Sequence, residues 1–130
     1  MDMSYFDYNV GLTMTNKKFN DLFGQKPRNP KNEKITQFHM DIAASIQKVT
    51  EEIVIKMVKE TKKLTNSNNL CLSGGVALNC VANGKIEELE IFENIYIQPA
   101  SGDAGGSLGA ALAINHMYFD SNRNYSKEYD

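Results

Sequence analysis

LCLSGGVALNC at residues 70–80 and IYIQPASGDAGGSLG at residues 95–109 are the two segments that decide the fold of this chain. Each begins with a short apolar run, continues into a glycine-bearing loop and leads into a segment of helical composition. Glycine lacks a Cβ, so a ligand can approach the backbone closely, and the N-terminus of a helix attracts anions. Two strand–loop–helix units in succession predict two loops at the same edge of one parallel sheet.

The pattern around these loops predicts alternating strands and helices. We expect short buried strands at residues 70–72 and 91–97, and helices at residues 76–83 and from residue 104 or 105 to about residue 118. Gly84 weakens the first of these helices, which leaves its continuation open. The sequence therefore favours an α/β fold with a β-α-β-α core and parallel strands.

A long amphipathic helix is expected before the first strand, at residues 36–65. Its apolar residues recur at three- and four-residue steps, as in a helix that packs through one face. They are Phe38, Ile42, Ile46, Val49, Ile53 and Met57. Charged residues, Glu51 among them, largely occupy the other side. We predict that this helix packs on the core through its apolar residues.

The two ends of the chain predict smaller features. Alternating apolar residues predict an edge strand or an extended arm at Phe6, Tyr8, Val10 and Leu12. A short helix is expected from Thr15 or Asn16 to Phe23, with Gly24 as its stop. Residues 25–34 read as a loop, and the polar residues 120–130 are expected to form a disordered tail.

Composition limits the classes of function. The chain has 130 residues, 42% of them hydrophobic and 23% charged, which suits a single domain over residues 1–130. A net charge of −2 gives no basic field for nucleic acid, and no apolar run approaches the roughly 20 residues of a membrane span. The N-terminus is too polar for a signal peptide, and Cys71 and Cys80 are expected to be reduced, packed thiols. These features favour a cytoplasmic protein.

Neither glycine loop matches a standard phosphate-binding fingerprint. The first loop lacks a following GK[ST], it is not G-x-G-x-x-G, and the second has the wrong spacing. The residues alone leave nucleotide or phosphate binding open against tight helix–strand packing. Asp103 is either a ligand of a metal or hydroxyl or the N-cap of the third helix. Asn79 either reads a ribose or base edge or bonds to neighbouring backbone.

Four segments of the chain resemble one enzyme family. LCLSGGVALNCVANGKI at residues 70–86 and QPASGDAGGSLGAAL at residues 98–112 resemble the O-carbamoyltransferases typified by nodulation proteins and antibiotic-tailoring enzymes. MTNKKFNDLFG at residues 14–24 and HMDIAASIQKV at residues 39–49 are similar to the same family. The resemblance runs over about residues 3–117, and its two glycine motifs are specific in sequence and in order.

The resemblance implies a partial actin-like ATPase fold, which is ribonuclease H-like, and an ATP-dependent reaction. Carbamoyl phosphate and ATP would form a carbamoyl adenylate, and the carbamoyl group would pass to a hydroxyl of a small-molecule acceptor. The motif along the adenosine corresponds to Ser73, Gly74, Gly75 and Asn79. The loop near the phosphates corresponds to Gly102, Asp103, Gly105 and Gly106. By the same resemblance Asp103 helps to ligate a divalent metal, typically iron, and no catalytic residue is assigned.

The chain also departs from the family pattern. Members of the family are several times longer, and their metal site uses two histidines four residues apart. This chain has only His39 and His116. We therefore expect a segment from the second half of the catalytic domain, inactive alone and completed by a missing-half partner or paired as a homodimer. The alternative is a non-catalytic nucleotide-binding or protein-interaction module.

Overall fold

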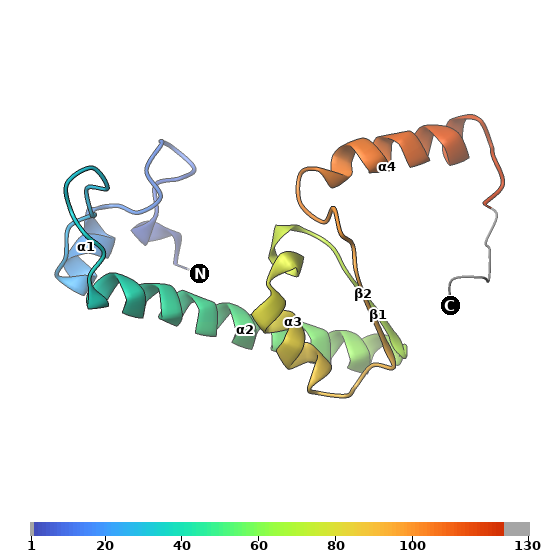
Figure 1. Cartoon of the computed structure of the whole chain (residues 1–130), viewed down its shortest axis with the longest axis horizontal. Helices are drawn as coiled ribbons and strands as arrows, with labels where there is room; N and C mark the ends of the chain where they lie inside the picture. Colours follow the sequence, from blue (N-terminus) through green and yellow to red (C-terminus); the bar gives the residue numbers. More distant parts are fainter. Residues whose placement is uncertain (1, 124–130) are drawn as a thin grey trace. The chain divides into compact units, whose positions relative to one another are not determined.

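The computed structural model describes residues 2–123 of the chain. These residues divide into two compact units, one that ends at Ala44 and one that begins at Ser45, and the division falls within the long helix α2, Gln37–Thr65 (Figure 1). The helix lies within one residue of the predicted range of 36–65. It contributes its first turns to the first unit and the remainder to the second unit.

The first unit contains a short 3-10 helix η1, Met3–Tyr5, the helix α1, Lys17–Phe23, and the start of α2. The side chain of Asn16 caps α1 by accepting hydrogen bonds from the backbone N–H groups of Lys18 and Phe19. Gly24 ends the helix in the left-handed conformation, with φ 65°. Both helix signals predicted from the sequence are confirmed.

The edge strand predicted at Phe6–Leu12 is wrong. Within the described residues this segment forms only one antiparallel bridge, between Phe6 and Thr15. The backbone N–H of Val10 donates to the carbonyl of Asp7 at 3.0 Å, so the chain turns where the alternating pattern would need extended backbone. Val10 and Leu12 are exposed at the end of this turn. Apolar alternation without a pairing strand was not sufficient to form a ladder.

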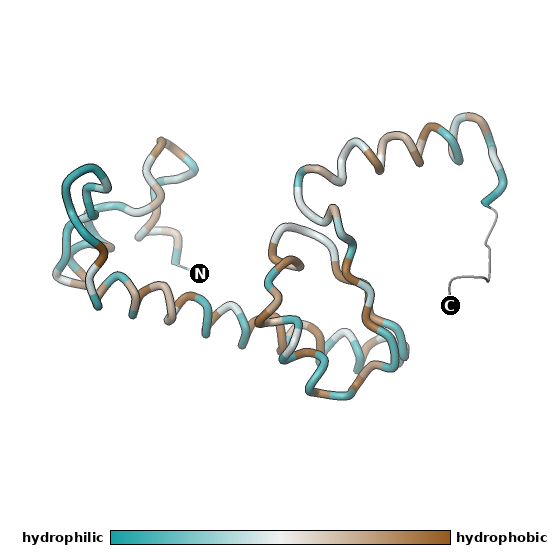
Figure 2. Tube along the Cα trace, in the orientation of Figure 1, coloured by the Kyte–Doolittle hydropathy of each residue, from teal (hydrophilic) through white to brown (hydrophobic). Residues whose placement is uncertain are grey.

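Aromatic rings form the contacts inside the first unit. The ring of Phe19 lies 6.0 Å from Phe6 and 4.8 Å from Phe23, and Phe23 lies 6.4 Å from Phe38 at the start of α2, measured between centroids. The connection between α1 and α2 is a hydrophilic loop, as predicted (Figure 2). Arg28 braces this loop by donating to the carbonyl of Glu33 at 2.7 Å.

The second unit has the predicted alternation of strands and helices. Strands β1, Asn69–Leu72, and β2, Asn94–Ile97, pair in parallel with Asn69 opposite Asn94 and Leu72 opposite Ile97. Between them lie a 3-10 turn η2, Gly75–Leu78, and the helix α3, Cys80–Glu87. After β2 come α4, Gly105–Ala113, and a π-helical turn η3, Ile114–Tyr118. The chain is therefore mixed α/β with a small parallel sheet.

The core of the second unit is small. Val58 of α2, Leu70 of β1 and Ile86 of α3 are buried together. Half-buried apolar side chains surround them, namely Val54, Leu72, Ile91, Phe92 and Ile95. Both α2 and α3 thus pack on the same face of the parallel pair, the face that carries Leu70, Leu72 and Ile95.

The packing face predicted for α2 is wrong in the second unit. The predicted apolar residues Ile46, Val49, Ile53 and Met57 are between 48% and 64% exposed. The buried residues of the helix are instead Glu51, at 4% exposed, and Val58. The side of the helix that faces α3 and β1 is mixed, because it carries Glu51, paired with Lys85, beside the apolar Val54 and Val58.

Two further predictions concern the ends and the thiols. Residues 120–123 are exposed and have no regular secondary structure, whereas residues 124–130 of the predicted disordered tail lie outside the described residues. Cys71 and Cys80 are free thiols, as predicted, but both are exposed, so the expected packing of their side chains is wrong.

None of the helices formed by residues 2–123 has the length and apolar character needed to span a bilayer.

Candidate nucleotide site at the junction of two glycine loops

The two glycine loops meet at one edge of the sheet. The backbone N–H of Gly74, two residues after β1, donates to the carbonyl of Ser101 at 2.9 Å. Because β1 and β2 are parallel, their carboxyl ends lie at the same edge, and this hydrogen bond joins the loops that follow them. Gly74 has φ 99°, a conformation that L side chains rarely adopt. The predicted juxtaposition of the loops is confirmed.

Gly105 is required by close packing of the second loop on itself. A Cβ at this position would lie 2.2 Å from the carbonyl oxygen of Ala100. In contrast, a Cβ at Gly75, Gly102 or Gly106 would have no neighbouring atom within 4 Å. Close packing therefore accounts for Gly105 alone, and nucleotide binding stays a prediction. One glycine serves backbone packing, and the others leave open space beside the loop junction.

Asp103 does not cap α4. The N-cap residue is Ala104, and no side chain caps the helix, so the capping alternative for Asp103 is wrong. The side chain of Asp103 is exposed, and we find no hydrogen bond or ion pair of its carboxylate with any residue between 2 and 123. Its own carbonyl accepts the N–H of Gly106 at 3.2 Å, which places the residue in the turn that starts the helix.

Ser101 is a site residue that the sequence did not identify. Its carbonyl holds Gly74, and its side chain is 6% exposed. The hydroxyl has no hydrogen-bond partner among the described residues. A buried polar group without a partner costs about 1–3 kcal/mol, so such groups are uncommon in folded proteins. Ser101 lies in the loop after β2, which ends at Ile97, and no local sequence signal pointed to this role.

Asn79 lies at the boundary of η2 and α3, and its amide is engaged within the protein. Its Oδ1 accepts the backbone N–H of Ala82 at 3.1 Å, which caps α3. Its Nδ2 donates to Oε1 of Gln47 at 2.8 Å, and Gln47 Nε2 donates back to Asn79 Oδ1 at 3.1 Å. The geometry favours the second alternative for Asn79, a local structural hydrogen bond.

An ion pair between the buried Glu51 and the part-exposed Lys85 lies next to this amide pair. Lys85 of α3 donates to Oε2 of Glu51, and Gln47 Nε2 donates to Glu51 Oε1 at 2.9 Å. The hydrogen bond from Lys85, followed by that from Gln47, lowers the pKa of Glu51 below its ordinary value of 4.5. Helix periodicity placed Glu51 on the solvent side, and no local sequence signal pointed to its partner 34 residues away.

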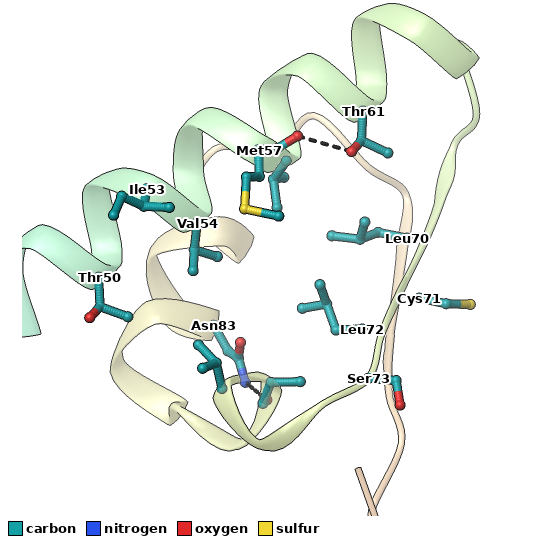
Figure 3. Close-up of a pocket in the computed structure, with 13 residues that line it drawn as sticks. Thr50, Ile53, Val54, Met57, Thr61, Leu70, Cys71, Leu72, Ser73 and Asn83 are labelled. Carbon is teal, nitrogen blue, oxygen red and sulfur yellow. Dashed lines mark hydrogen bonds between the residues drawn. The ribbon is translucent and has the colours of Figure 1, made fainter. Parts of the chain in front are cut away.

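An apolar pocket of about 460 Å³ lies between α2 and β1. Leu70 and Leu72 of β1 extend toward α2, and Ser73 follows them at the end of the strand (Figure 3). The lining residues are Thr50, Ile53, Val54, Met57, Val58, Thr61, Leu70, Cys71, Leu72, Ser73, Val76, Ala77 and Asn83. Of the predicted site residues only Ser73 lines this pocket, so the pocket adjoins the first glycine loop at the end of β1.

Metal-binding side chains do not gather at the junction. Among residues 2–123 no group of three or more His, Cys, Asp or Glu side chains is arranged to hold a metal ion. His39 contacts Thr36, and Nδ1 of His116 lies 2.8 Å from the carbonyl oxygen of Ser121. A single carboxylate, that of Asp103, does not form a complete site for a divalent ion.

Comparison with known proteins shows one consistent group of relatives. A family model described as carbamoyltransferase N-terminus matches residues 1–112. The chain is 54% identical over 123 residues to an uncharacterized protein of Synechocystis, an alignment that covers 95% of this chain and 20% of that protein.

Two named relatives share shorter segments. Nodulation protein NolO of Bradyrhizobium diazoefficiens is 46% identical over 80 residues, which is 62% of this chain and 15% of that protein. The tRNA N6-adenosine threonylcarbamoyltransferase of Ureaplasma parvum is 33% identical over 91 residues, which is 68% of this chain and 28% of the enzyme. The chain thus spans less than a third of the length of each of these relatives.

Proposed function

This chain belongs to the carbamoyltransferase N-terminal family, and from that membership we propose that it forms part of an ATP-dependent O-carbamoyltransferase. The enzyme would move a carbamoyl group from carbamoyl phosphate, through carbamoyl adenylate, to a hydroxyl-bearing small molecule. The name of the Ureaplasma relative, a threonylcarbamoyltransferase, supports transfer of a carbamoyl-type group. This chain would supply part of the nucleotide site.

The observation that carries the proposal is the hydrogen bond from Gly74 to Ser101, which joins the two glycine loops. A nucleotide at this junction would lie over open space at Gly75, Gly102 and Gly106. The first turn of α4 has no side-chain cap, and the positive end of the helix dipole there suits a phosphate. Ser73 precedes the first loop and would lie beside the nucleoside.

The complete carbamoyl transfer would require protein segments in addition to this chain. The chain spans 20% of the Synechocystis relative, so we propose that its two units belong to one incomplete domain of the actin-like, ribonuclease H-like type. A partner segment, or a second copy of the chain, would cover the remaining faces. We place this enzyme in the cytoplasm, with no nucleic acid or membrane as its partner.

The proposed metal uses Asp103 as one ligand among several. The carboxylate is exposed at the second loop, and the described residues do not complete the site. The other ligands would come from outside residues 2–123. Because the donor set in this chain is incomplete, we derive no step of the reaction through the metal, typically iron in this family. Removal of Asp103 should leave nucleotide binding by the isolated chain in place.

Calorimetry with ATP tests the nucleotide site. We expect submillimolar binding to the wild-type chain and loss of binding in Gly75→Asp, because a carboxylate would enter the open space and repel the phosphates. Gly109→Asp is the matched control, since it adds the same charge on α4 where a Cβ also meets no atom within 4 Å. Equal affinity in both variants, or no binding to the wild type, would refute the nucleotide site.

A second assay tests whether the chain is sufficient for chemistry. The isolated chain is incubated with ATP, carbamoyl phosphate and a divalent metal, and pyrophosphate release is followed. We expect no turnover, because an open half of a cleft does not exclude water from an adenylate. Turnover at a rate above the protein-free control would show that residues of this chain complete the site.

The second candidate is a non-catalytic nucleotide-binding or protein-interaction module. An exposed apolar row on α2 favours it, because soluble domains rarely leave a continuous apolar surface uncovered. The row consists of Ile46, Val49, Ile53 and Met57. Binding of a partner or a second copy without ATP affinity would support this candidate. The calorimetric experiment therefore separates a protein-interaction module from a chain that holds a nucleotide site.

A further inference from the structure

In the part-buried polar contact between α2 and α3, each hydrogen bond has a defined donor and acceptor. Lys85 donates to Glu51, Gln47 donates to Glu51 at 2.9 Å, and Gln47 also donates to Oδ1 of Asn79 at 3.1 Å. Asn79 returns a hydrogen bond from Nδ2 to Oε1 of Gln47 at 2.8 Å and accepts from the N–H of Ala82 at 3.1 Å.

Glu51 sets this direction. An ionised carboxylate only accepts hydrogen bonds, so the group of Gln47 that faces it must be the NH₂ group. That orientation turns Oε1 of Gln47 toward Nδ2 of Asn79. In consequence Oδ1 of Asn79 faces the free N–H groups at the start of α3, which is the orientation that a cap requires. The opposite amide orientation would place two donors, or two acceptors, against each other.

The cap is directly connected to the first glycine loop. Asn79 is both the C-cap of η2 and the N-cap of α3, and its own N–H donates to the carbonyl of Val76 at 3.0 Å. Ala77 closes the same turn by donating to the carbonyl of Gly74 at 2.9 Å. A change in the orientation of Asn79 is therefore transmitted through one 3-10 turn to the loop that meets Ser101.

We propose that Gln47 is a positioning residue for the first glycine loop. It transmits the orientation imposed by the Glu51–Lys85 ion pair to Asn79, and Asn79 holds η2 and the start of α3. Asn79 acts here through its contacts with protein, not by reading a nucleotide. The expected change in ATP affinity rests on the proposed function, whereas the expected change in amide protection of the loop does not.

Amide hydrogen exchange of the full chain, followed by NMR, tests the role of Gln47. Gln47→Met keeps the length and bulk of the side chain but removes its N–H donors and its carbonyl acceptor. We expect the protection factors of Ala77, Asn79 and Ala82 to fall about tenfold or more, with the amides of β1 and β2 unchanged. Unchanged protection at all three amides would overturn the proposal.

Gln37→Met is the matched control in the same helix. Gln37 also donates from its amide to a carboxylate, that of Asp41 at 2.7 Å, but this contact is exposed and distant in sequence from α3. This variant should leave the protection of η2 and α3 as in the wild type. An equal loss of protection in both variants would show a general effect of removing an amide from α2, which contradicts a specific role of Gln47.

Gln47→Glu should make amide protection depend on pH, which a loss of side-chain packing alone would not do. The new carboxyl group would face Glu51, with Lys85 of α3 and Lys48 of α2 as the nearby cations. Two adjacent carboxyl groups share one proton, and the pKa of one of them rises. We expect low protection at pH 8 and recovery toward the wild-type protection factors near pH 5, where a protonated carboxyl both donates and accepts. Protection that does not depend on pH would overturn the proposal, even if Gln47→Met does not fold.

ATP affinity separates this inference from the proposed function. If the wild type binds ATP, Gln47→Met should weaken binding about fivefold or more, because the loop is no longer held in place. Weakening of less than about twofold would overturn the positioning role in binding. If the wild type does not bind ATP, the nucleotide function fails, and the exchange experiment alone decides the role of Gln47.

Discussion

Gly105 is the residue at which the backbone of the second loop leaves no space for a side chain. A Cβ would lie 2.2 Å from the carbonyl oxygen of Ala100, and backbone atoms cannot move away cheaply. Gly105→Ala should therefore lower the free energy of unfolding by about 1–3 kcal/mol, as for other overpacked sites. Urea denaturation of the full chain measures this change.

Gly106→Ala is the control for that experiment, because a Cβ at this neighbouring position meets no atom within 4 Å. In the first turn of α4 it should leave stability unchanged or raise it by up to about 1 kcal/mol, through helix propensity. Equal stability of the two variants would contradict close packing as the reason for Gly105.

Single residues were predictable from the sequence only where a local signal exists. The glycine loops and Asp103 stand out because glycine and aspartate at a strand end are uncommon without a reason. Ser101 has no such signal, since its role depends on a carbonyl that meets Gly74 from another loop. For Asn79 the sequence left two alternatives, and the contact with Gln47, 32 residues away, favours one of them.

At the scale of elements, the contact between α2 and α3 should make stability depend on pH. The hydrogen bonds from Lys85 and Gln47 lower the pKa of Glu51 in the folded state. As the pH falls, the unfolded chain binds this proton first, near the ordinary value of 4.5. The contribution of Glu51 is therefore fully present above pH 4.5 and is lost as the pH falls through the lowered folded-state pKa.

Comparison of Glu51→Gln with the wild type tests this dependence. The variant should be less stable above pH 4.5, and the difference in free energy of unfolding should narrow in acid. Glu52→Gln, at the exposed neighbouring position, is the matched control. A difference between Glu51→Gln and the wild type that stays constant down to low pH would show that the lowered pKa does not contribute to stability.

The existence of the elements was more predictable than their contacts. The period of the apolar residues predicts a helix at residues 36–65, which forms at 37–65, and the short apolar runs predict β1 and β2. The period does not show which side of a helix meets the rest of the chain when one side is apolar and the other carries an ion pair. The predicted strand at Phe6–Leu12 failed for a related reason, because a ladder needs a partner that composition does not reveal.

At the scale of the whole molecule, the exposed apolar row of α2 affects association more than stability. Ile46, Ile53 and Met57 are 62%, 51% and 64% exposed. Ile46→Lys should change the free energy of unfolding by no more than about 0.5 kcal/mol, as for most surface substitutions. It should also reduce any self-association, because it interrupts the row with a charge. Light scattering over a range of concentrations measures the second effect.

Val58→Lys is the contrasting variant, since Val58 is 3% exposed in the core. This substitution should prevent stable folding of the second unit, because it buries an unpaired charge. If Ile46→Lys destabilises the chain as strongly as Val58→Lys, the row is covered in solution by part of the chain itself, and the exposed face described above is wrong.

The parallel pairing of β1 and β2 has a consequence for synthesis of the chain. The strands, α3 and the final turns of α2 all lie before Ile97 in the sequence. Chains fold from the N-terminus as they emerge, and domains generally fold as units. Because β1 pairs with β2, the edge of β1 stays unpaired until β2 has also left the ribosome, and the second glycine loop closes onto Gly74 only after that.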